Sequence, residues 1–489
     1  MRKILFLFIG FIFLLSGCIN YFHDLSKEIS NASASDAFIS AFSFHPDDNP
    51  ELDKEYNGNI VDNKNQILIV VPGDSGVKGL TLIPRFTAKG LVYVNGAIQT
   101  SGLSGQPFSA DVVYTAVSAN EKYQKSYTVR ILKIDSRIYV KPDAAGNGDG
   151  SSWENAFTSL HEAIETASLF HESLQKEIWI AAGTYKPVQS EDENAFFHLV
   201  ANTSYIGGFE GNETGINARN IAVNKTIISG DLGSGQSNNL FANADIAAVG
   251  RFITFDGIAF EKSAAAINAF LSPTARLIIL NCAFSDIQGT AVFSFHGRRT
   301  TITNSTFDNI AANGNFGAVF INGEEISITN SGFNNITGDA VSIICSDAAI
   351  ENTYFKNITA KGQALYISQN AASGYININK VDVDTVTGRG IYISSHTLYL
   401  INSVIKNCDA GEGFGGGIHI VNSGRAEISS VDINDTSAKT GGGIYYDGSA
   451  ASSSLLVRNV KYDGEIIYKN HPKAHLFGNN IEFDDVIVP

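Results

Sequence analysis

Several aromatic side chains and one histidine recur at the same place in a series of short repeats, which makes them the first candidates for chemistry. Aromatic rings stack on the apolar faces of sugars, and a tyrosine hydroxyl can also bond to sugar hydroxyls. Rings about 4.8 Å apart, the spacing of hydrogen-bonded strands, suit an extended polymer. The same rings can instead stack on one another and only stabilise the repeats. The candidate ligand-binding stripe consists of Phe320, Tyr366, Tyr392, His419 and Tyr445, in a column that also holds Phe293 and Ser342.

The stripe contains one arrangement that could serve catalysis. Tyr392, His419 and Tyr445 fall in consecutive repeats, and a histidine beside a tyrosine can exchange protons with a substrate. A single histidine in an aromatic column is more often a packed residue, so we predict no catalytic residue. The sequence contains no P-loop, dinucleotide glycine motif, Cys/His zinc spacing or EF-hand loop. It therefore predicts no cofactor and no metal site.

The repeats that carry the stripe run from Arg276 to Asp447, and each has an asparagine near its middle. Successive asparagines are 23, 26, 22, 27 and 23 residues apart. A period of this size indicates a solenoid, because one unit cannot bury its apolar face alone. Apolar and polar residues alternate, the apolar ones are mostly β-branched, and no repeat has room for a helix. The asparagines are Asn281, Asn304, Asn330, Asn352, Asn379 and Asn402.

We therefore predict a parallel β-helix with one coil per repeat, in which loops of different length account for the unequal steps. Asparagine suits a fixed corner, since it tolerates a left-handed backbone and its amide can bond to the amide one coil away. A second corner column follows at Asp286, Asn309, Asn335, Asn357 and Asn407. The residue before each stripe position is expected to point inward. This inner column is Val319, Val341, Leu365, Ile391, Ile418 and Ile444.

The repeats resemble right-handed parallel β-helix proteins of the pectin-lyase-like kind, over about residues 137–489. The run Gly441-Gly-Gly-Ile444 and the upstream F-x-N-I pattern also resemble the GGA-I and F-x-x-N repeats of bacterial polymorphic outer-membrane proteins, with GGG in place of GGA. The resemblance implies an all-β fold and is specific for the fold rather than for the function.

The same resemblance implies two enzymatic alternatives. Pectate-lyase relatives remove a proton from a uronate with a basic residue, and Ca²⁺ or arginine neutralises the acid. Polygalacturonase-like hydrolases use grouped carboxylates with Gly-His-Gly and Arg-x-Lys motifs, neither of which is present. Arg298-Arg299 is the only tight basic pair in the repeats, and we expect no carboxylate cluster beside it. The sequence thus favours a non-enzymatic surface protein in adhesion or glycan binding, and a polysaccharide lyase or glycoside hydrolase is the alternative.

The N-terminus predicts export and attachment to a membrane. Arg2-Lys3 precedes an apolar run that is too short to act as a stop-transfer helix. Leu15-Ser-Gly-Cys18 resembles a bacterial lipobox, which implies that residues 1–17 are a lipoprotein signal peptide and that Cys18 carries lipid. The chain would then be anchored in the cell envelope, at the outer membrane or cell surface. The alternative is an ordinary signal peptide with a chance cysteine.

Two further segments precede the repeats. Residues 18–35 are polar and small, as in a linker. Residues 36–133 contain several short strand patterns separated by turn residues such as Asn95-Gly96, which predict a small β-sandwich. The sandwich resembles the cadherin-like or immunoglobulin-like modules of bacterial surface proteins. The residues that carry this resemblance are Asp48-Asn-Pro50, Val94-Asn-Gly96, Thr100-Ser-Gly102 and Ser126-Tyr-Thr-Val-Arg-Ile131.

The two ends of the β-helix are expected to be covered, because open strand edges promote aggregation. Apolar residues at helical spacing predict an N-terminal capping helix. Residues 468–489 lose the repeat and are expected to cap the other end. The residues of the helical face are Ala156, Phe157, Leu160, Ala163, Ile164 and Ala167.

The net charge restricts the possible partners of the chain, and the positions of the cysteines argue against disulfides. The chain has 489 residues, 44% of them hydrophobic, and a net charge of −15, which argues against a nucleic-acid partner. The possible partners are therefore the membrane, through Cys18, and a glycan or another surface protein, and we expect a monomer. Cys282, Cys345 and Cys408 sit at different places in their repeats, so we expect small buried hydrophobes rather than disulfides.

Overall fold

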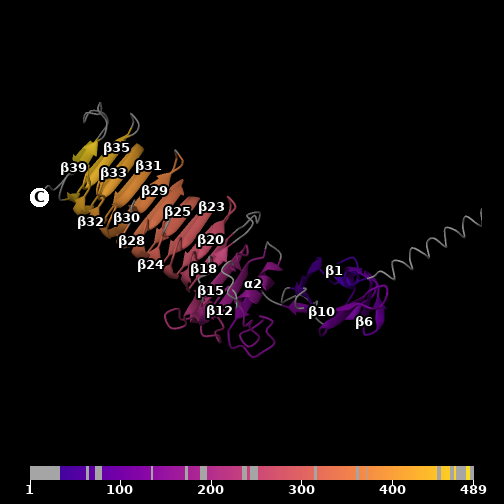
Figure 1. Ribbon diagram of the computed structural model, residues 1–489. Helices are drawn as coiled ribbons and strands as arrows, with labels where there is room; N and C mark the ends of the chain where they lie inside the picture. The colour runs from indigo at the N-terminus through magenta and orange to yellow at the C-terminus, as the bar shows by residue number, and fades with distance from the viewer. Residues whose placement is uncertain are drawn as a thin grey trace, which may run out of the picture. The chain divides into compact units, whose positions relative to one another are not determined.

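The computed structural model of the chain divides between Ser136 and Arg137 into two compact units (Figure 1). Lipidation at Cys18, the signal peptide and most of the predicted linker lie outside the described residues. No helix in the described part of the chain is long and apolar enough to cross a bilayer. The described residues are 33–61, 65–71, 80–133, 136–170, 174–187, 195–233, 239–242, 252–312, 316–359, 363–371, 373–448, 453–462, 467–469 and 481–484.

The first unit is sandwich-like. Its strands follow the order β5-β1-β2-β3-β10-β9-β6-β7, and β4 pairs with β8. Phe42 and Phe44 of β1 pack against Tyr114 and Phe108, with ring centroids 5.1 Å and 5.0 Å apart. Its elements are a short 3-10 turn (Ala34–Asp36), β1 (Phe38–Phe44), β2 (Tyr56–Val61), β3 (Gln66–Val71), β4 (Thr81–Leu82), β5 (Pro84–Lys89), β6 (Leu91–Val94), β7 (Ala97–Gln99), β8 (Gln106–Pro107), β9 (Val112–Val117) and β10 (Gln124–Lys133).

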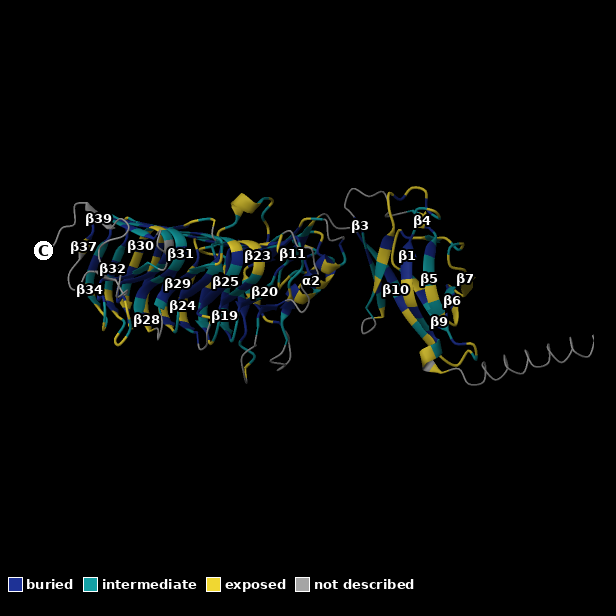
Figure 2. Cartoon of the chain, turned by 90° about the horizontal axis from the view of Figure 1, so that it is seen from above, coloured by how far each residue is buried: buried dark blue, intermediate teal, exposed yellow. Residues whose placement is uncertain are grey.

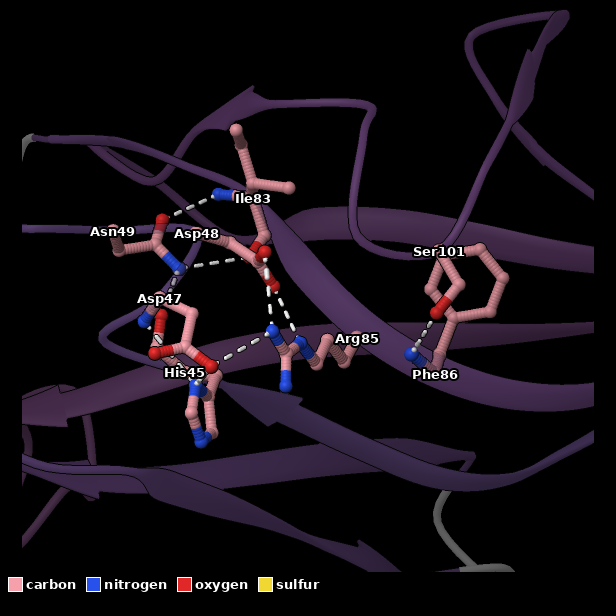
Figure 3. Close-up of polar contacts among 8 residues, drawn as sticks. All are labelled: His45, Asp47, Asp48, Asn49, Ile83, Arg85, Phe86 and Ser101. Atoms are coloured by element: carbon pink, nitrogen blue, oxygen red, sulfur yellow. Dashed lines mark hydrogen bonds and ion pairs between the residues drawn. The ribbon is translucent and has the colours of Figure 1, made fainter.

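Two of the motifs in this unit have a structural explanation. Asn95 and Gly96 have φ of 49° and 81° and close the β6–β7 hairpin, the backbone that a two-residue hairpin turn requires. Asn49, 1% exposed, bonds to the backbone of Ile83 with both ends of its amide, at 2.7 Å and 2.9 Å. Figure 3 shows this clamp beside the ion pair of Arg85 Nε with Asp48, at 2.5 Å. Both motifs hold turns in place.

The second unit is a parallel β-helix with three rows of strands, and the strand pairs among its described residues are all parallel. The first row contains β14 (Phe197–His198), β17 (Phe241–Ala242), β20 (Ile267–Phe270), the first parts of β23 (Val292–Thr303), β25 (Val319–Thr329), β31 (Arg389–Ile401) and β33 (Ile418–Ser429), and β27 (Val341–Cys345), β29 (Gln363–Gln369), β35 (Ile444–Gly448) and β38 (Ile467–Lys469).

The second and third rows complete each coil. The second row contains β11 (Arg137–Val140), β12 (Lys176–Ala181), β15 (Thr203–Phe209), β18 (Ile253–Asp256), β21 (Arg276–Leu280), the second parts of β23, β25, β31 and β33, the first parts of β28 (Asp347–Thr359) and β30 (Ile376–Val386), and β36 (Ser454–Arg458) and β39 (Ile481–Asp484). The third row contains β13 (Gly183–Tyr185), β16 (Thr226–Ser229), β19 (Ile258–Ser263), β22 (Ala283–Ile287), β24 (Thr306–Ala311), β26 (Gly332–Thr337), the second parts of β28 and β30, and β32 (Val404–Asp409), β34 (Asp432–Ser437) and β37 (Lys461–Tyr462).

The core of the β-helix is a set of columns that run from coil to coil, and the buried residues appear dark blue in Figure 2. The predicted inner column is confirmed: its members pair in register from Val319 to Ile444 and are at most 1% exposed. In five consecutive coils of the third row, inward phenylalanines at one register position form a ladder. Its successive rings stack at 4.8, 4.6, 4.6 and 5.0 Å from Phe260 through Phe284, Phe307 and Phe333 to Phe355.

The corner columns are confirmed except at one position. Asn281, Asn304, Asn330, Asn352 and Asn402 have φ between 46° and 52°, and Asn304 Nδ2 donates to Asn281 Oδ1 at 3.2 Å. The second column is also left-handed, at Asp286, Asn309, Asn335, Asn357 and Asn407. Asn379 was placed in the first column, but Lys380 has the positive φ of 54°. Asn379 instead ends the strand segment and accepts a hydrogen bond from Asn402 Nδ2 at 3.0 Å.

The predicted capping helix is α2 (Leu160–Ser168), which lies against β11, β12 and β14. Leu160, Ala163, Ile164 and Ala167 are all buried on its inner face. The predicted helical face began too early, because Phe157 instead forms a parallel bridge with Val140 of β11. At the far end, β38 and β39 still pair in register with β35 and β36, so the coils extend into the segment that was expected to be only a cap.

Candidate functional site

The predicted stripe forms one column on the first row. Strand register joins Phe293 to Phe320, then Ser342, Tyr366, Tyr392, His419 and Tyr445 in order. Each of these residues follows an inner-column residue, so its side chain leaves the opposite face of the strand. The sequence therefore placed the stripe in the correct register.

The rings of the stripe are stacked on each other. Tyr366 and Tyr392 lie 5.1 Å apart and nearly parallel, at 5°. The His419 ring packs edge-on between Tyr392 and Tyr445, at 4.9 Å and 4.8 Å. Tyr366 and Tyr392 therefore turn one face toward each other, and the edge-on His419 ring occupies the space between Tyr392 and Tyr445. A sugar needs an open ring face to stack on, so the stripe is poorly suited to be a continuous sugar platform.

Two loop aromatics cover parts of the stripe. Phe316 packs on Phe320 at 4.8 Å, and Phe414 packs on Tyr445 at 4.9 Å. Phe320, His419 and Tyr445 are consequently only 7%, 8% and 3% exposed. At these three positions the stripe is therefore closed to a ligand. Of the five stripe residues, only Tyr366 and Tyr392 are half-buried, so a binding role for the stripe stays a prediction for this pair.

His419 is a poor candidate for the base of a lyase. Burial and then the nearby Arg389 lower the pKa of His419 to about 4. Among the described residues, His419 Nδ1 has no hydrogen-bond partner. Burial shifts the pKa of Tyr392 the opposite way, above the ordinary value of a tyrosine hydroxyl. Both side chains are therefore neutral at neutral pH, and each has a pKa shifted away from the value that proton transfer near pH 7 favours.

A groove on the second row is the cavity that sequence reasoning missed. It has a volume of about 440 Å³, which lies within the range of about 300–1,000 Å³ that small-molecule sites occupy. Strands β23, β25 and β28 form its floor, and Tyr375, just before β30, borders it. The residues that line this groove are Arg299, Thr301, Glu325, Ile326, Ser327, Asp347, Ala348, Ala349 and Tyr375.

The charged residues of the groove occupy one register position on successive coils. Arg299 pairs with Glu325 in the strand register, and Glu325 pairs with Asp347. The Arg299 guanidinium donates to Glu325 through Nε at 2.8 Å and also through its terminal nitrogen. Arg298 Nε lies 3.9 Å from the same carboxylate. Glu325 therefore lies beside the Arg298-Arg299 pair, and Asp347 follows one coil further on.

Asp347 fixes the aromatic side of the groove. Its Oδ1 accepts a hydrogen bond from the backbone N–H of Tyr375 at 2.9 Å. Tyr375 is 53% exposed, which makes it one of the most exposed large aromatic side chains of the described coils. The groove thus combines a ring, two carboxylates, a guanidinium and the hydroxyls of Thr301 and Ser327. Aligning the second strand of each repeat would have brought these residues together in the sequence.

Neither a metal site nor a reactive cysteine adds to this set among the residues that the structure describes. Within the described ranges, no group of three or more His, Cys, Asp or Glu side chains is placed to hold a metal ion. Cys282, Cys345 and Cys408 are free and buried, which confirms that they pack as small hydrophobes. Burial raises the pKa of each thiol to about 12, so none is a nucleophile near neutral pH.

Comparisons with known proteins give only distant likenesses. No protein-family model matches the chain, and no curated protein matches it significantly. The chain is similar to the solved catalytic unit of a thermostable GH87 alpha-1,3-glucanase from Streptomyces thermodiastaticus strain HF3-3, at 10% identity and a TM-score of 0.38, over 94% of this chain and 86% of that chain. It is also similar to the catalytic domain of a GH87 alpha-1,3-glucanase in complex with nigerose, at 10% identity and a TM-score of 0.22, over 92% and 87% of the two chains. Scores this low carry no argument about activity.

Proposed function

We propose that this chain is a lipid-anchored protein of the cell envelope whose β-helix binds a glycan in the groove of the second row. One observation carries the proposal: an exposed tyrosine borders a groove that is otherwise lined by carboxylates, a guanidinium and hydroxyls. A sugar ring has an apolar face and a rim of hydroxyls. Tyr375 offers a surface for the face, and the charged groups offer strong hydrogen bonds to the rim.

The hydrogen-bonding capacity of the groove is only partly used within the protein. Asp347 Oδ1 is bonded to the Tyr375 backbone, and among the described residues Asp347 Oδ2 has no hydrogen-bond partner. Glu325 Oε2 accepts hydrogen bonds from both Nε and a terminal nitrogen of Arg299, and such charge-assisted bonds are stronger than neutral ones. Preorganised polar groups beside an apolar ring are what gives a small-molecule site its orientation and specificity.

The charge of the chain restricts the class of glycan. The net charge is −15, and the groove itself contains two carboxylates and one guanidinium. A polyuronate would be repelled unless a cation bridged it to the protein. The proposed ligand is therefore a neutral or basic glycan.

Binding of cellohexaose, xylohexaose, mannohexaose and chitohexaose to the purified whole chain in detergent tests the proposal. At least one should bind, and Tyr375→Ala and Asp347→Asn should each weaken that binding, Tyr375→Ala by roughly two- to tenfold for one aromatic contact. Tyr123→Ala is the matched control, because Tyr123 is an exposed tyrosine, 41%, in the other unit. If both groove variants bind every ligand as tightly as the wild type does, the groove is not the site.

Hydrolysis is a second candidate, favoured by the pair of carboxylates in the groove. Glu325 and Asp347 share one register position on adjacent coils, and coils lie about 4.8 Å apart. Retaining glycosidases hold their two carboxyl groups about 5–5.5 Å apart. New reducing ends that appear with the wild type and disappear with Glu325→Gln and with Asp347→Asn would establish this candidate. Binding without any cleavage would leave the non-enzymatic proposal standing.

The anchor has its own test. Cells grown with an alkyne-tagged fatty acid should attach the label to the wild-type chain, and Cys18→Ser should abolish the label and release the chain from membranes. The proposal rests on the motif Leu15-Ser-Gly-Cys18, and several acyl chains on one residue anchor a protein stably. A Cys18→Ser chain that keeps the label would overturn the lipoprotein proposal.

A further inference from the structure

A tyrosine on the third row lies flat over a glycine of the preceding coil. Tyr354 of β28 pairs in register with Gly332 of β26. A Cβ added to Gly332 would lie 2.1 Å from Cζ, 2.3 Å from Cε1 and 2.3 Å from Oη of Tyr354. Such similar distances to three atoms of the phenol place that point above the face of the ring and not beside its edge. The ring therefore covers the glycine with one of its faces.

The other face of Tyr354 is turned to solvent. Tyr354 is 45% exposed, whereas Gly332 beneath it is buried. Within the described part of the chain, no aromatic ring or cation packs on Tyr354. This arrangement is the opposite of that in the stripe, where neighbouring rings cover each other's faces. A single exposed aromatic residue is common on protein surfaces. Here, however, the absence of a side chain at Gly332 lets the ring lie flat on the backbone, with its other face open.

Polar side chains border the ring at the next outward positions. Asn334 pairs in register with Asp308 on one neighbouring coil and with Lys356 on the other. Asn334 Nδ2 donates to Asp308 Oδ1 at 2.8 Å, which orients both groups. Lys356 is exposed and makes no ion pair with any described residue. An apolar face is thus bordered by an amide, a carboxylate and an ammonium group, all of which can bond to hydroxyls.

We propose that Tyr354 is a second sugar-binding site, on which a pyranose ring stacks while Asn334, Asp308 and Lys356 bond to its hydroxyls. The inference takes its ligand class from the proposed glycan-binding function but uses a different face of the β-helix. The ring rests on the backbone at Gly332, which removes part of its freedom before any ligand binds. Preorganisation reduces the ordering entropy that binding must overcome.

Glycine and tyrosine variants separate the role of the flat ring from the mere presence of a tyrosine. Gly332 has no left-handed φ, so alanine fits its backbone but lifts the ring. Gly332→Ala and Tyr354→Ala should each weaken binding of whichever hexaose the wild-type chain binds by roughly two- to tenfold. Tyr354→Phe keeps the ring and should bind within about twofold of the wild type, as should the control Tyr123→Ala.

NMR of the whole chain with ring-¹³C tyrosine, titrated with the four hexaoses named above, reports on the two sites separately. The proposal predicts that the Tyr354 signal, assigned from Tyr354→Phe, shifts with the ligand. If the Tyr375 signal shifts and the Tyr354 signal does not, the second site is wrong and the groove stands. If only Tyr354 responds, the second site stands and the groove is wrong. If neither signal responds to any hexaose, both proposals are overturned.

Discussion

The first and second rows of the β-helix use their outward side chains in different ways. On the first row, the stripe residues stack along the axis, and Phe316 and Phe414 cover several of them. On the second row, Arg299, Glu325 and Asp347 form a charged column that leaves a groove open to solvent. Both rows follow the same alternation of inward and outward residues. In a solenoid, then, an outward position is not necessarily an accessible one.

The difference arises from the size and chemistry of the side chains. Flat apolar rings about one coil spacing apart remove surface from water when they stack, so the stripe gains stability by being closed. Charged groups stay hydrated and gain little from exclusion of water. A row of charges therefore remains open, and a single ring such as Tyr375 at its edge stays exposed. The stripe accordingly contributes to stability, and the groove is the better candidate for binding.

The inner column gives the largest expected effect. Leu365 is 0% exposed between Val341 and Ile391, so Leu365→Asp buries an unpaired charge, which costs several kcal/mol. We expect the β-helix to unfold, as followed by circular dichroism. Ser368→Asp, on the outward side of the same strand, is the control and should fold. A folded Leu365→Asp chain would contradict the inward register.

Truncating a stripe residue should have the next largest effect. Phe320 is 7% exposed and stacks on Phe293 at 5.2 Å, so Phe320→Ala should lower the free energy of unfolding by about 3 kcal/mol. Urea titration of the whole chain measures this change. A loss below about 1 kcal/mol would mean that the stripe does not stabilise the fold by packing. The stripe would then again be a candidate binding surface.

His419 should make the stability of the first row depend on pH. Its folded-state pKa of about 4 lies below the ordinary value of 6.5, so the unfolded chain binds the proton more tightly. The contribution of the neutral His419 ring to the free energy of unfolding is complete above pH 6.5, and it is lost as the pH falls toward about 4. The loss is on the order of 3 kcal/mol.

The variant His419→Phe keeps a ring between Tyr392 and Tyr445 but cannot titrate. Relative to the wild type, its free energy of unfolding should therefore rise as the pH is lowered through this window. Parallel curves for the two chains between pH 4 and 6.5 would show that His419 is not buried as a neutral ring. The groove on the second row should contribute no such histidine-dependent change of stability with pH, because no histidine lines it.

The smallest expected effect is on the stability of the groove variant. Tyr375 is 53% exposed, so Tyr375→Ala should change the free energy of unfolding by no more than about 0.5 kcal/mol. The same urea titration as for Phe320→Ala makes the comparison direct. A large loss of stability in Tyr375→Ala would remove the distinction between a packed first row and an open second row.

The sequence alone determined the repeat, the strands and the direction of each side chain. Alternation with period 2 and a left-handed corner at Asn281, Asn304 or Asn330 specify which residues point inward, because a slip of one residue would turn the whole apolar set to solvent. The inner column and the order of the stripe could therefore be predicted without a structure. The exception, Asn379, shows the limit: Lys380 adopts the corner backbone, and only the register to the neighbouring coils reveals it.

Only the tertiary structure decided which outward residues are accessible. Phe316 and Phe414 belong to loops whose lengths differ from coil to coil, so no repeat pattern places them over Phe320 and Tyr445. The groove depends in the same way on Tyr375, which Asp347 fixes from the preceding coil. The flat ring of Tyr354 depends on Gly332, a residue 22 positions earlier that the coil brings beneath it. Contacts between coils and variable loops are set by three-dimensional packing, which the periodicity of a sequence does not encode.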